Sequence, residues 1–270
     1  MQVPVIVCAI AAGCGMGEAD NTMNAIYILW LRQLKRYFRS KSRMIGSLGQ
    51  PILFLFALGF GIGPVYAKAG QGNYLQFLVP GVVSMGILFT AIFSGVEVIW
   101  DKQFGFLKET LVAPVSRLSI MFGRTLGGAT VAVMQGGIVL ILSMLFGFRF
   151  SIAALPMALV FMFLIALLFT ALGTALASVL EDMQGFQLIM NFLVMPLFFL
   201  SGALFPVNDN TPQILKMITA FDPLAYGVDG LRDVLIGVTH FGLMTDVVVL
   251  SLVTAFFVAL GSYLFSKIQI

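Results

Sequence analysis

Six long segments without a charged side chain dominate this sequence of 270 residues. The segments cover residues 44–67, 69–96, 125–148, 150–180, 183–208 and 247–266. Each is as long as the roughly 20 residues that an α-helix needs to cross a bilayer. Their apolar runs are continuous, whereas a membrane β-strand alternates over about 10 residues. Because backbone groups in lipid must pair internally, we expect an all-α membrane protein with six transmembrane helices in a domain over residues 44–270.

The distribution of charge predicts how the chain is oriented. Charged residues make up 10% of the chain and hydrophobic residues 60%, whereas charged residues alone are about 25% of a soluble protein. With the region before the first span in the cytoplasm, eleven Lys and Arg residues fall on that side and four on the other. The positive-inside rule then predicts a multi-pass protein of the cell membrane with both termini cytoplasmic. The basic residues adjoin a span, where lipid headgroups are the nearer partner, so no nucleic-acid binding is expected.

Residues 1–22 are expected to be a disordered leader or a start-site extension, because a well-patterned helix opens at Met23. The uncharged stretch over residues 3–17 could instead be a signal-peptide core, although no basic residue precedes it. Cys8 and Cys14 do not have the spacing of a metal site.

Residues 23–43 predict an amphipathic connecting helix before the first span. Apolar side chains recur at helical spacing from Ile26 to Tyr37, and arginines fall on another face. We therefore expect an interfacial helix on the inner leaflet, with its aromatic rings at headgroup depth and its cations on lipid phosphates. The residues assigned to this interface are Trp30, Arg32, Arg36 and Arg39. The alternative is a basic segment that only sets the topology.

The longest expected cytoplasmic loop, residues 101–124, mixes charged and apolar side chains. A loop that only linked two spans could be shorter and wholly polar, so this one is expected to dock onto a partner. The alternative is an amphipathic stretch that rests on the bilayer. The docking residues of this predicted coupling loop are Phe104, Phe106, Leu107, Glu109, Leu111, Pro114 and Arg117. Glu97, within a turn of the interface, is expected to be hydrated.

Residues 201–237, after the fifth span, are too interrupted by prolines to cross a membrane. Their apolar side chains and few charges predict an external segment that dips into the outer leaflet as re-entrant half-helices or lies along it. Gln135 and Asn191 lie inside spans. Each is expected to be an interhelical hydrogen-bond partner, with a substrate ligand as the alternative.

The sequence has no motif for catalysis, metal binding or nucleotide binding. It contains no G-x-x-x-x-G-K phosphate loop, no H-E-x-x-H and no G-x-S-x-G, so an enzyme is not expected. Ion-coupled carriers normally place ionisable residues near the bilayer midplane, and the six uncharged segments supply none. We therefore expect transport that is driven by a partner on the cytoplasmic loops.

Three stretches resemble the type-2 ATP-binding-cassette (ABC) permeases, a family that includes drug exporters of the daunorubicin-resistance type and polysaccharide exporters. The first is the basic helix over residues 30–43, and the second is the loop that ends in Ala113-Pro114-Val115-Ser116-Arg117. The third comprises Ser201-Gly202, Phe205-Pro206, Asp222-Pro223-Leu224 and Leu231-Arg232. Together the resemblance covers about residues 24–268.

The resemblance implies the permease subunit of an ATP-driven exporter that moves a hydrophobic or amphipathic substrate, drug-like or lipid-like, out of the cytoplasm. ATP and Mg would bind a separate ATPase subunit that docks on the coupling loop, with Glu181 and Asp182 as a second contact. A second permease copy would complete a homodimer. The external re-entrant residues would be Phe205, Pro206, Pro223 and Arg232. The alternatives are a polysaccharide or glycolipid exporter, and a membrane scaffold or sensor that transports nothing.

Overall fold

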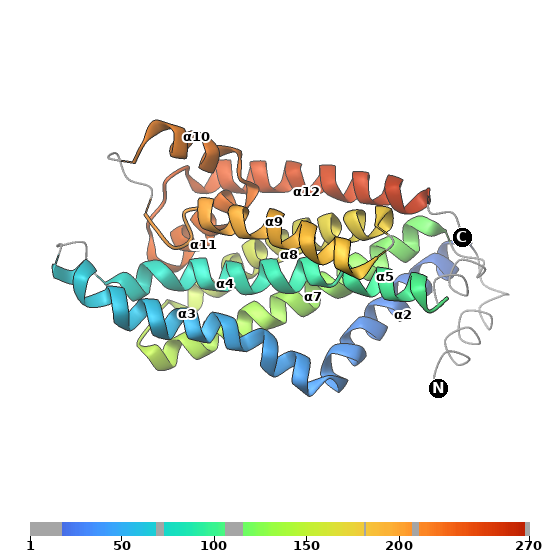
Figure 1. Cartoon of the computed structure of the whole chain (residues 1–270), viewed down its shortest axis with the longest axis horizontal. Coiled ribbons are helices and arrows are strands. Elements are labelled where there is room, and N and C mark those ends of the chain that lie inside the picture. Colours follow the sequence, from blue (N-terminus) through green and yellow to red (C-terminus); the bar gives the residue numbers. More distant parts are fainter. Residues whose placement is uncertain (1–17, 69–72, 106–115, 181, 207–210, 268–270) are drawn as a thin grey trace.

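The computed structural model describes residues 18–68, 73–105, 116–180, 182–206 and 211–267, and every regular element in these ranges is a helix (Figure 1). The helices are α2 (Glu18–Arg39), α3 (Lys41–Lys68), α4 (Tyr74–Phe93), α5 (Val96–Gln103), α7 (Arg117–Ser143), α8 (Leu155–Val179), α9 (Met183–Leu200), α10 (Gln213–Phe221), α11 (Pro223–Ile236) and α12 (Leu243–Ser266). Two short 3-10 helices, η1 (Met144–Phe146) and η2 (Ile152–Ala154), join α7 to α8. The all-α prediction is confirmed.

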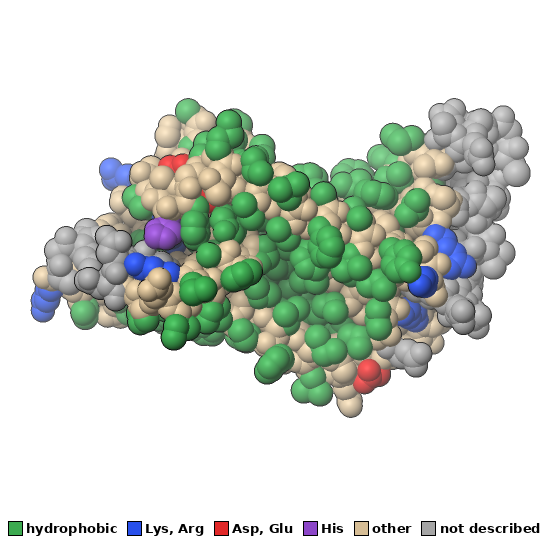
Figure 2. All heavy atoms as spheres, turned by 90° about the horizontal axis from the view of Figure 1, so that it is seen from above, with side chains coloured by type: hydrophobic (Ala, Val, Ile, Leu, Met, Phe, Trp, Pro, Cys, Tyr) green, Lys and Arg blue, Asp and Glu red, His purple; other side chains and the backbone are tan. Residues whose placement is uncertain are grey.

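Six helical stretches are long and apolar enough to cross a membrane. They are Met44–Tyr66, Tyr74–Gln103, Arg117–Phe146, Ile152–Val179, Met183–Leu200 and Leu243–Ser266. Each overlaps one uncharged segment, so the prediction of six candidate spans is confirmed. Figure 2 shows apolar side chains across the middle of one face, with Lys and Arg side chains gathered toward its two ends. Such a distribution is expected of a chain whose middle lies in hydrocarbon.

Three spans extend beyond the uncharged segments. The span formed by α4 and α5 takes in Glu97, Asp101 and Lys102, and the spans of α7 and α12 each take in a buried charge. Helix α7 takes in Arg124, and α12 takes in Asp246. Both residues are buried, with exposed fractions of 3% and 0%. A charge that faces lipid is costly, so the sequence alone predicts that a span stops where Arg124 or Asp246 is reached. In the structure the surrounding helices, rather than lipid, enclose these two side chains.

Helix α4 lies at the centre of the bundle, where it packs against α3, α7, α8 and α11. In the stretch formed by α4 and α5, 72% of the most apolar window is buried, against 11% for α3. Large side chains such as Phe161 and Phe169 of α8 are fully enclosed. The fold therefore has a tightly packed interior and leaves α3 at its margin.

Helix α2 packs along α7 at the end of the bundle that carries α5, called here the α5 end (Figure 1). It begins at Glu18, before the boundary predicted at Met23. The side chains that it buries are Ala25, Leu29, Gln33 and Tyr37. Glycines of α7 permit the close approach, since a Cβ at Gly123 would lie 3.0 Å from the carbonyl oxygen of Ile26. The predicted amphipathic helix thus turns its apolar face toward the protein, while its position relative to a membrane stays a prediction.

At the opposite end, called here the α11 end, two short helices follow α9. The carboxylate of Asp222 accepts a hydrogen bond from the backbone N–H of Leu224 at 2.8 Å and so caps α11, whose first residue is Pro223. Helix α11 is largely buried among α4, α8 and α12. Apolar side chains of α10 stay exposed, among them Ile214 and Phe221. The segment predicted to be too broken to span therefore forms one exposed and one buried short helix.

Candidate docking end of the bundle

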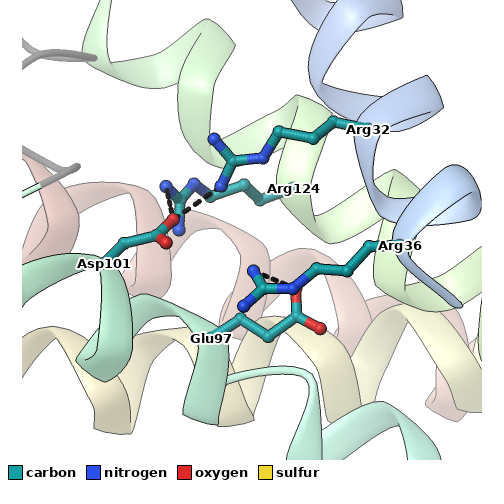
Figure 3. Close-up of polar contacts among 5 residues, drawn as sticks. All are labelled: Arg32, Arg36, Glu97, Asp101 and Arg124. Atoms are coloured by element: carbon teal, nitrogen blue, oxygen red, sulfur yellow. Dashed lines mark hydrogen bonds and ion pairs between the residues drawn. The ribbon is translucent and has the colours of Figure 1, made fainter. Parts of the chain in front are cut away.

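Helix α5 carries a cluster of ion pairs at the α5 end (Figure 3). Asp101 is almost completely buried, with 6% of its side chain exposed. One of its carboxylate oxygens, Oδ2, accepts from Arg32 Nη2 of α2 at 2.6 Å and from Arg124 Nη2 of α7 at 2.5 Å. A single carboxylate therefore holds two arginines from two other helices. Such charge-assisted bonds are short and strong, and their loss would leave buried cations without a counterion.

A second ion pair lies one turn earlier on α5. Glu97 pairs with Arg36 of α2, with 3.5 Å between Oε2 and Nη1 (Figure 3). The guanidinium of Arg36 also lies 5.8 Å from the centre of the Trp100 ring. Glu97 is 4% exposed, so the expectation that it is hydrated is wrong. Its counterion comes from α2, which lies far away in the sequence, and this pairing makes its burial tolerable.

Two further hydrogen bonds attach α2 to α7. Trp30 Nε1 donates to Thr130 Oγ1 at 3.0 Å, and the hydroxyl of Tyr37 donates to Gln135 Oε1 at 2.5 Å. Gln135 is thus an interhelical hydrogen-bond partner, as predicted. Asn191, by contrast, is exposed on α9. The structure shows it in no such bond within the described ranges.

Sequence reasoning did not predict the role of Lys102, the residue after Asp101. Its ammonium donates to the backbone carbonyl oxygens of Ala177, Ser178 and Leu180, at 3.0, 2.6 and 3.3 Å. These carbonyls lie at the C-terminal end of α8, where no backbone donor follows to satisfy them. The adjacent residues of α5 therefore reach different helices, Asp101 reaching α2 and α7, and Lys102 reaching α8. The sequence shows a basic residue at this position, but it does not indicate which carbonyl groups the side chain bonds.

Comparison with known proteins shows to which family the chain belongs. The family model described as ABC-2 type transporter matches residues 24–236. The chain belongs to that family. The permease is 27% identical to nodulation protein J of Rhizobium leguminosarum bv. viciae over 229 residues, which are 82% of the chain and 87% of that protein. It is 25% identical over 238 residues to daunorubicin resistance ABC transporter permease protein DrrB1 of Streptomyces coeruleorubidus, covering 86% and 82% of the two chains.

The predicted docking residues of the permease fall partly within the described ranges. Phe104 directly follows α5 and has 70% of its surface exposed. Arg117 begins α7, and its Nη1 donates to the carbonyl oxygen of Ser266 at 2.7 Å. The predicted docking residues that lie outside the described ranges are Phe106, Leu107, Glu109, Leu111 and Pro114.

The second predicted contact and the interfacial residues are placed as follows. Asp182 is exposed and caps α9 by accepting from the backbone N–H of Gly185 at 2.9 Å, while Glu181 lies outside the described ranges. Arg39 is exposed in the last turn of α2. The other interfacial residues of the permease, Trp30, Arg32 and Arg36, contact α5 and α7 as described above. Their expected lipid contacts stay a prediction.

At the α11 end, Arg232 is the most enclosed of the predicted external residues, with 7% of its surface exposed. Its Nη2 donates to the carbonyl oxygen of Gly202 at 3.1 Å, and its guanidinium lies 3.9 Å from the centre of the Phe77 ring. Burial lowers the pKa of Arg232 to about 10, which still leaves it cationic at neutral pH. Phe205 is exposed, and Pro206 is half-buried beside it. Arg232 therefore joins α11 of the permease to α4 and to the turn after α9.

The cap of α11 should make the permease sensitive to pH. Burial raises the pKa of Asp222 to about 7, and the hydrogen bond from Leu224 opposes this rise. An unfolded chain releases that proton near pH 3.9, so the folded state holds more protons between about pH 4 and 7 and loses stability as the pH rises through this window. Asp222→Asn keeps a capping oxygen but does not titrate. Melting temperatures of the purified permease across this range should fall for the wild type more steeply than for the variant, and equal slopes would refute the assignment.

Proposed function

We propose that the chain is the permease subunit of an ATP-driven exporter that moves a hydrophobic or amphipathic substrate, drug-like or lipid-like, out of the cytoplasm. The observation that carries this proposal is the family match over residues 24–236. One relative is named for resistance to daunorubicin, which favours a substrate of that chemical kind. The multi-pass bundle would lie in the cell membrane with its α5 end and both termini in the cytoplasm, because most Lys and Arg residues belong to that end.

A separate ATPase subunit, which binds ATP and Mg, is the proposed partner at the α5 end. The coupling loop leaves α5 just after the ion-pair cluster and enters α7 at Arg117. Asp101 joins α5 to α7 and α2 at short distances, so the helices on both sides of the loop form one connected unit. Exposed Phe104 supplies an apolar surface where the loop begins. A docked partner would therefore act on three helices together rather than on a loose connector.

A second copy of the permease, as a homodimer, is proposed to cover the exposed faces of α3 and α9. Only 11% of the most apolar window of α3 and 22% of that of α9 is buried within the chain. Apolar side chains cover the outside of α9, among them Leu188 and Phe192, and Asn191 lies exposed between them. A polar amide is costly in lipid and favourable at a helix interface where it finds a partner. The position of Asn191 thus supports a protein neighbour on this face.

The two membrane surfaces have their own proposed contacts. Helix α2 is proposed to lie along the inner leaflet, with exposed Tyr27 and Phe38 among lipid and exposed Arg39 at the phosphates. Helix α10 is proposed to lie in the outer leaflet, where exposed Ile214 and Phe221 would be buried among acyl chains. ATP binding would shift the packing of the two copies only to the extent that the ATP-bound partner prefers one arrangement.

The test is recovery of the ATPase partner with the tagged permease from detergent-solubilised membranes. Leu107→Asp with Leu111→Asp should abolish recovery, because charges would replace apolar docking side chains. The matched control, Leu→Ile at the same two positions, keeps the surface apolar and should recover the partner fully. The mass of the wild-type complex should correspond to two permeases and two ATPases. Recovery of no ATPase with the wild type would favour the scaffold or sensor instead.

A further inference from the structure

In the structure α5 extends to Gln103 and α7 begins at Arg117, so the coupling loop is the stretch between these helices. Two cations flank this stretch, and each of them bonds to the C-terminal end of a different helix. Lys102, on the side of α5, donates to three carbonyl oxygens at the end of α8, the shortest bond being 2.6 Å to Ser178. Arg117, on the side of α7, donates to the carbonyl oxygen of Ser266 at the end of α12, at 2.7 Å. Neither helix is a sequence neighbour of the loop.

These contacts have a clear physical basis. The last carbonyl groups of a helix find no backbone donor, and the aligned peptide dipoles place partial negative charge there. A cation at this position both satisfies the carbonyls and stabilises the helix end. Lys102 bonds the α8 end at the residues that lead to the second predicted contact, Asp182. Lys102 therefore holds the last turn of α5, which precedes the loop, to the C-terminal end of α8.

The two helices that receive these cations lie side by side and continue to the other end of the bundle (Figure 1). Helices α8 and α12 both pack against α11. The contact with α11 is close, because a Cβ at Gly227 of α11 would lie 2.6 Å from Ile165 Cγ1 of α8. A displacement of α8 and α12 along their axes would thus bear directly on α11.

We propose that Lys102 and Arg117 are positioning residues that make the α8–α12 pair move with the docked ATPase, so that ATP binding at the α5 end displaces α11 at the other. The inference rests on the proposed function. For Lys102 it differs from a docking role, because this cation need not touch the partner, and for Arg117 it adds the bond to α12 to the predicted docking role. It also assigns the α8–α12 pair, rather than α4 or α7 alone, as the element that links the two ends.

The first arm of the test uses the purified permease without any partner. Lys102→Met keeps the length of the side chain and removes the donors, so hydrogen–deuterium exchange at the C-terminal end of α8 should be about tenfold faster than in the wild type. Lys102→Arg keeps donors and should exchange like the wild type. Lys35→Met changes an exposed lysine at the same end and should alter nothing at α8. Arg117→Met and Arg117→Lys give the corresponding pair for the end of α12.

The second arm uses the complex with its ATPase, and compares the nucleotide-free state with one trapped by ATP and vanadate. In the wild type, exchange of the α11 amides should differ between the two states. Lys102→Met should recover the ATPase at the wild-type level but lose that difference, whereas Lys102→Arg should keep it.

Three results would overturn the inference. In the first, Lys102→Met keeps the wild-type response of α11. In the second, Lys102→Met loses the ATPase itself, which would make this cation part of the docking surface. In the third, the arginine and lysine replacements behave like methionine. A wild type that recovers no ATPase would instead refute the proposed function, and this inference with it, whereas a wild type that recovers the partner limits any failure to the inference.

Discussion

Replacing Asp101 with leucine is expected to lower the free energy of unfolding by about 3–5 kcal/mol, because breaking a buried ion pair leaves an uncompensated charge. Arg124, with 3% of its side chain exposed, would lose the carboxylate that it bonds, and Arg32 would lose the same one. The measurement is denaturant unfolding of the purified permease in detergent.

Two variants bracket this result. Asp101→Asn keeps an oxygen that accepts from the arginines and should cost less than leucine. Arg39→Gln removes an exposed cation from the end of α2 and should change stability by no more than about 0.5 kcal/mol. If the leucine variant were as stable as the Arg39 variant, the ion-pair cluster would not hold the helices together.

Gly127→Val should separate α2 from α7 and lower stability by about 1–3 kcal/mol, the usual cost of overpacking. A Cβ at Gly127 would lie 2.7 Å from both Cβ and Cγ of Gln33, too close for α2 to stay where it is. A displaced α2 should also be cut faster by trypsin at Lys35, which gives a second measurement by gel.

Gly137→Val is the matched control for this prediction. It places the same side chain in the same helix, and a Cβ there meets nothing within 4 Å. Valine is somewhat better than glycine inside a helix, so stability should hold or rise slightly. Equal losses from both valines would mean that α7, rather than its contact with α2, is what the substitution disturbs.

The spans could be predicted from the sequence, but the side-chain pairs between helices could not. Length and continuous hydrophobicity are local properties, so all six candidate spans could be predicted. The sequence predicts that a span begins only after Arg124, because an isolated charge avoids lipid. The carboxylate that accommodates it, Asp101, comes from another helix, and no local pattern indicates that pairing.

At the α5 end, too, local properties could be predicted from the sequence and contacts between helices could not. The basic character of α2 was evident, but the aromatic residue expected at the headgroups, Trp30, bonds Thr130, a residue 100 positions away. In the sequence Lys102 is one of the basic residues that predict the topology, whereas in the structure it caps α8. Such contacts depend on which helix ends meet in space, and amphipathic periodicity within one segment carries no information about that.

The distance in sequence between α2 and its partners also sets an order of events during synthesis. Thr130 leaves the ribosome 100 residues after Trp30, and Asp101 leaves it 69 residues after Arg32. At about 5–20 residues per second, α2 waits for several seconds before the helix that it packs on exists. During that interval Arg32 and Arg36 lack the carboxylates of α5 that they pair with in the folded chain. The polar contacts that hold α2 to α5 and α7 can therefore form only late in synthesis, after most of the first half of the chain has been made.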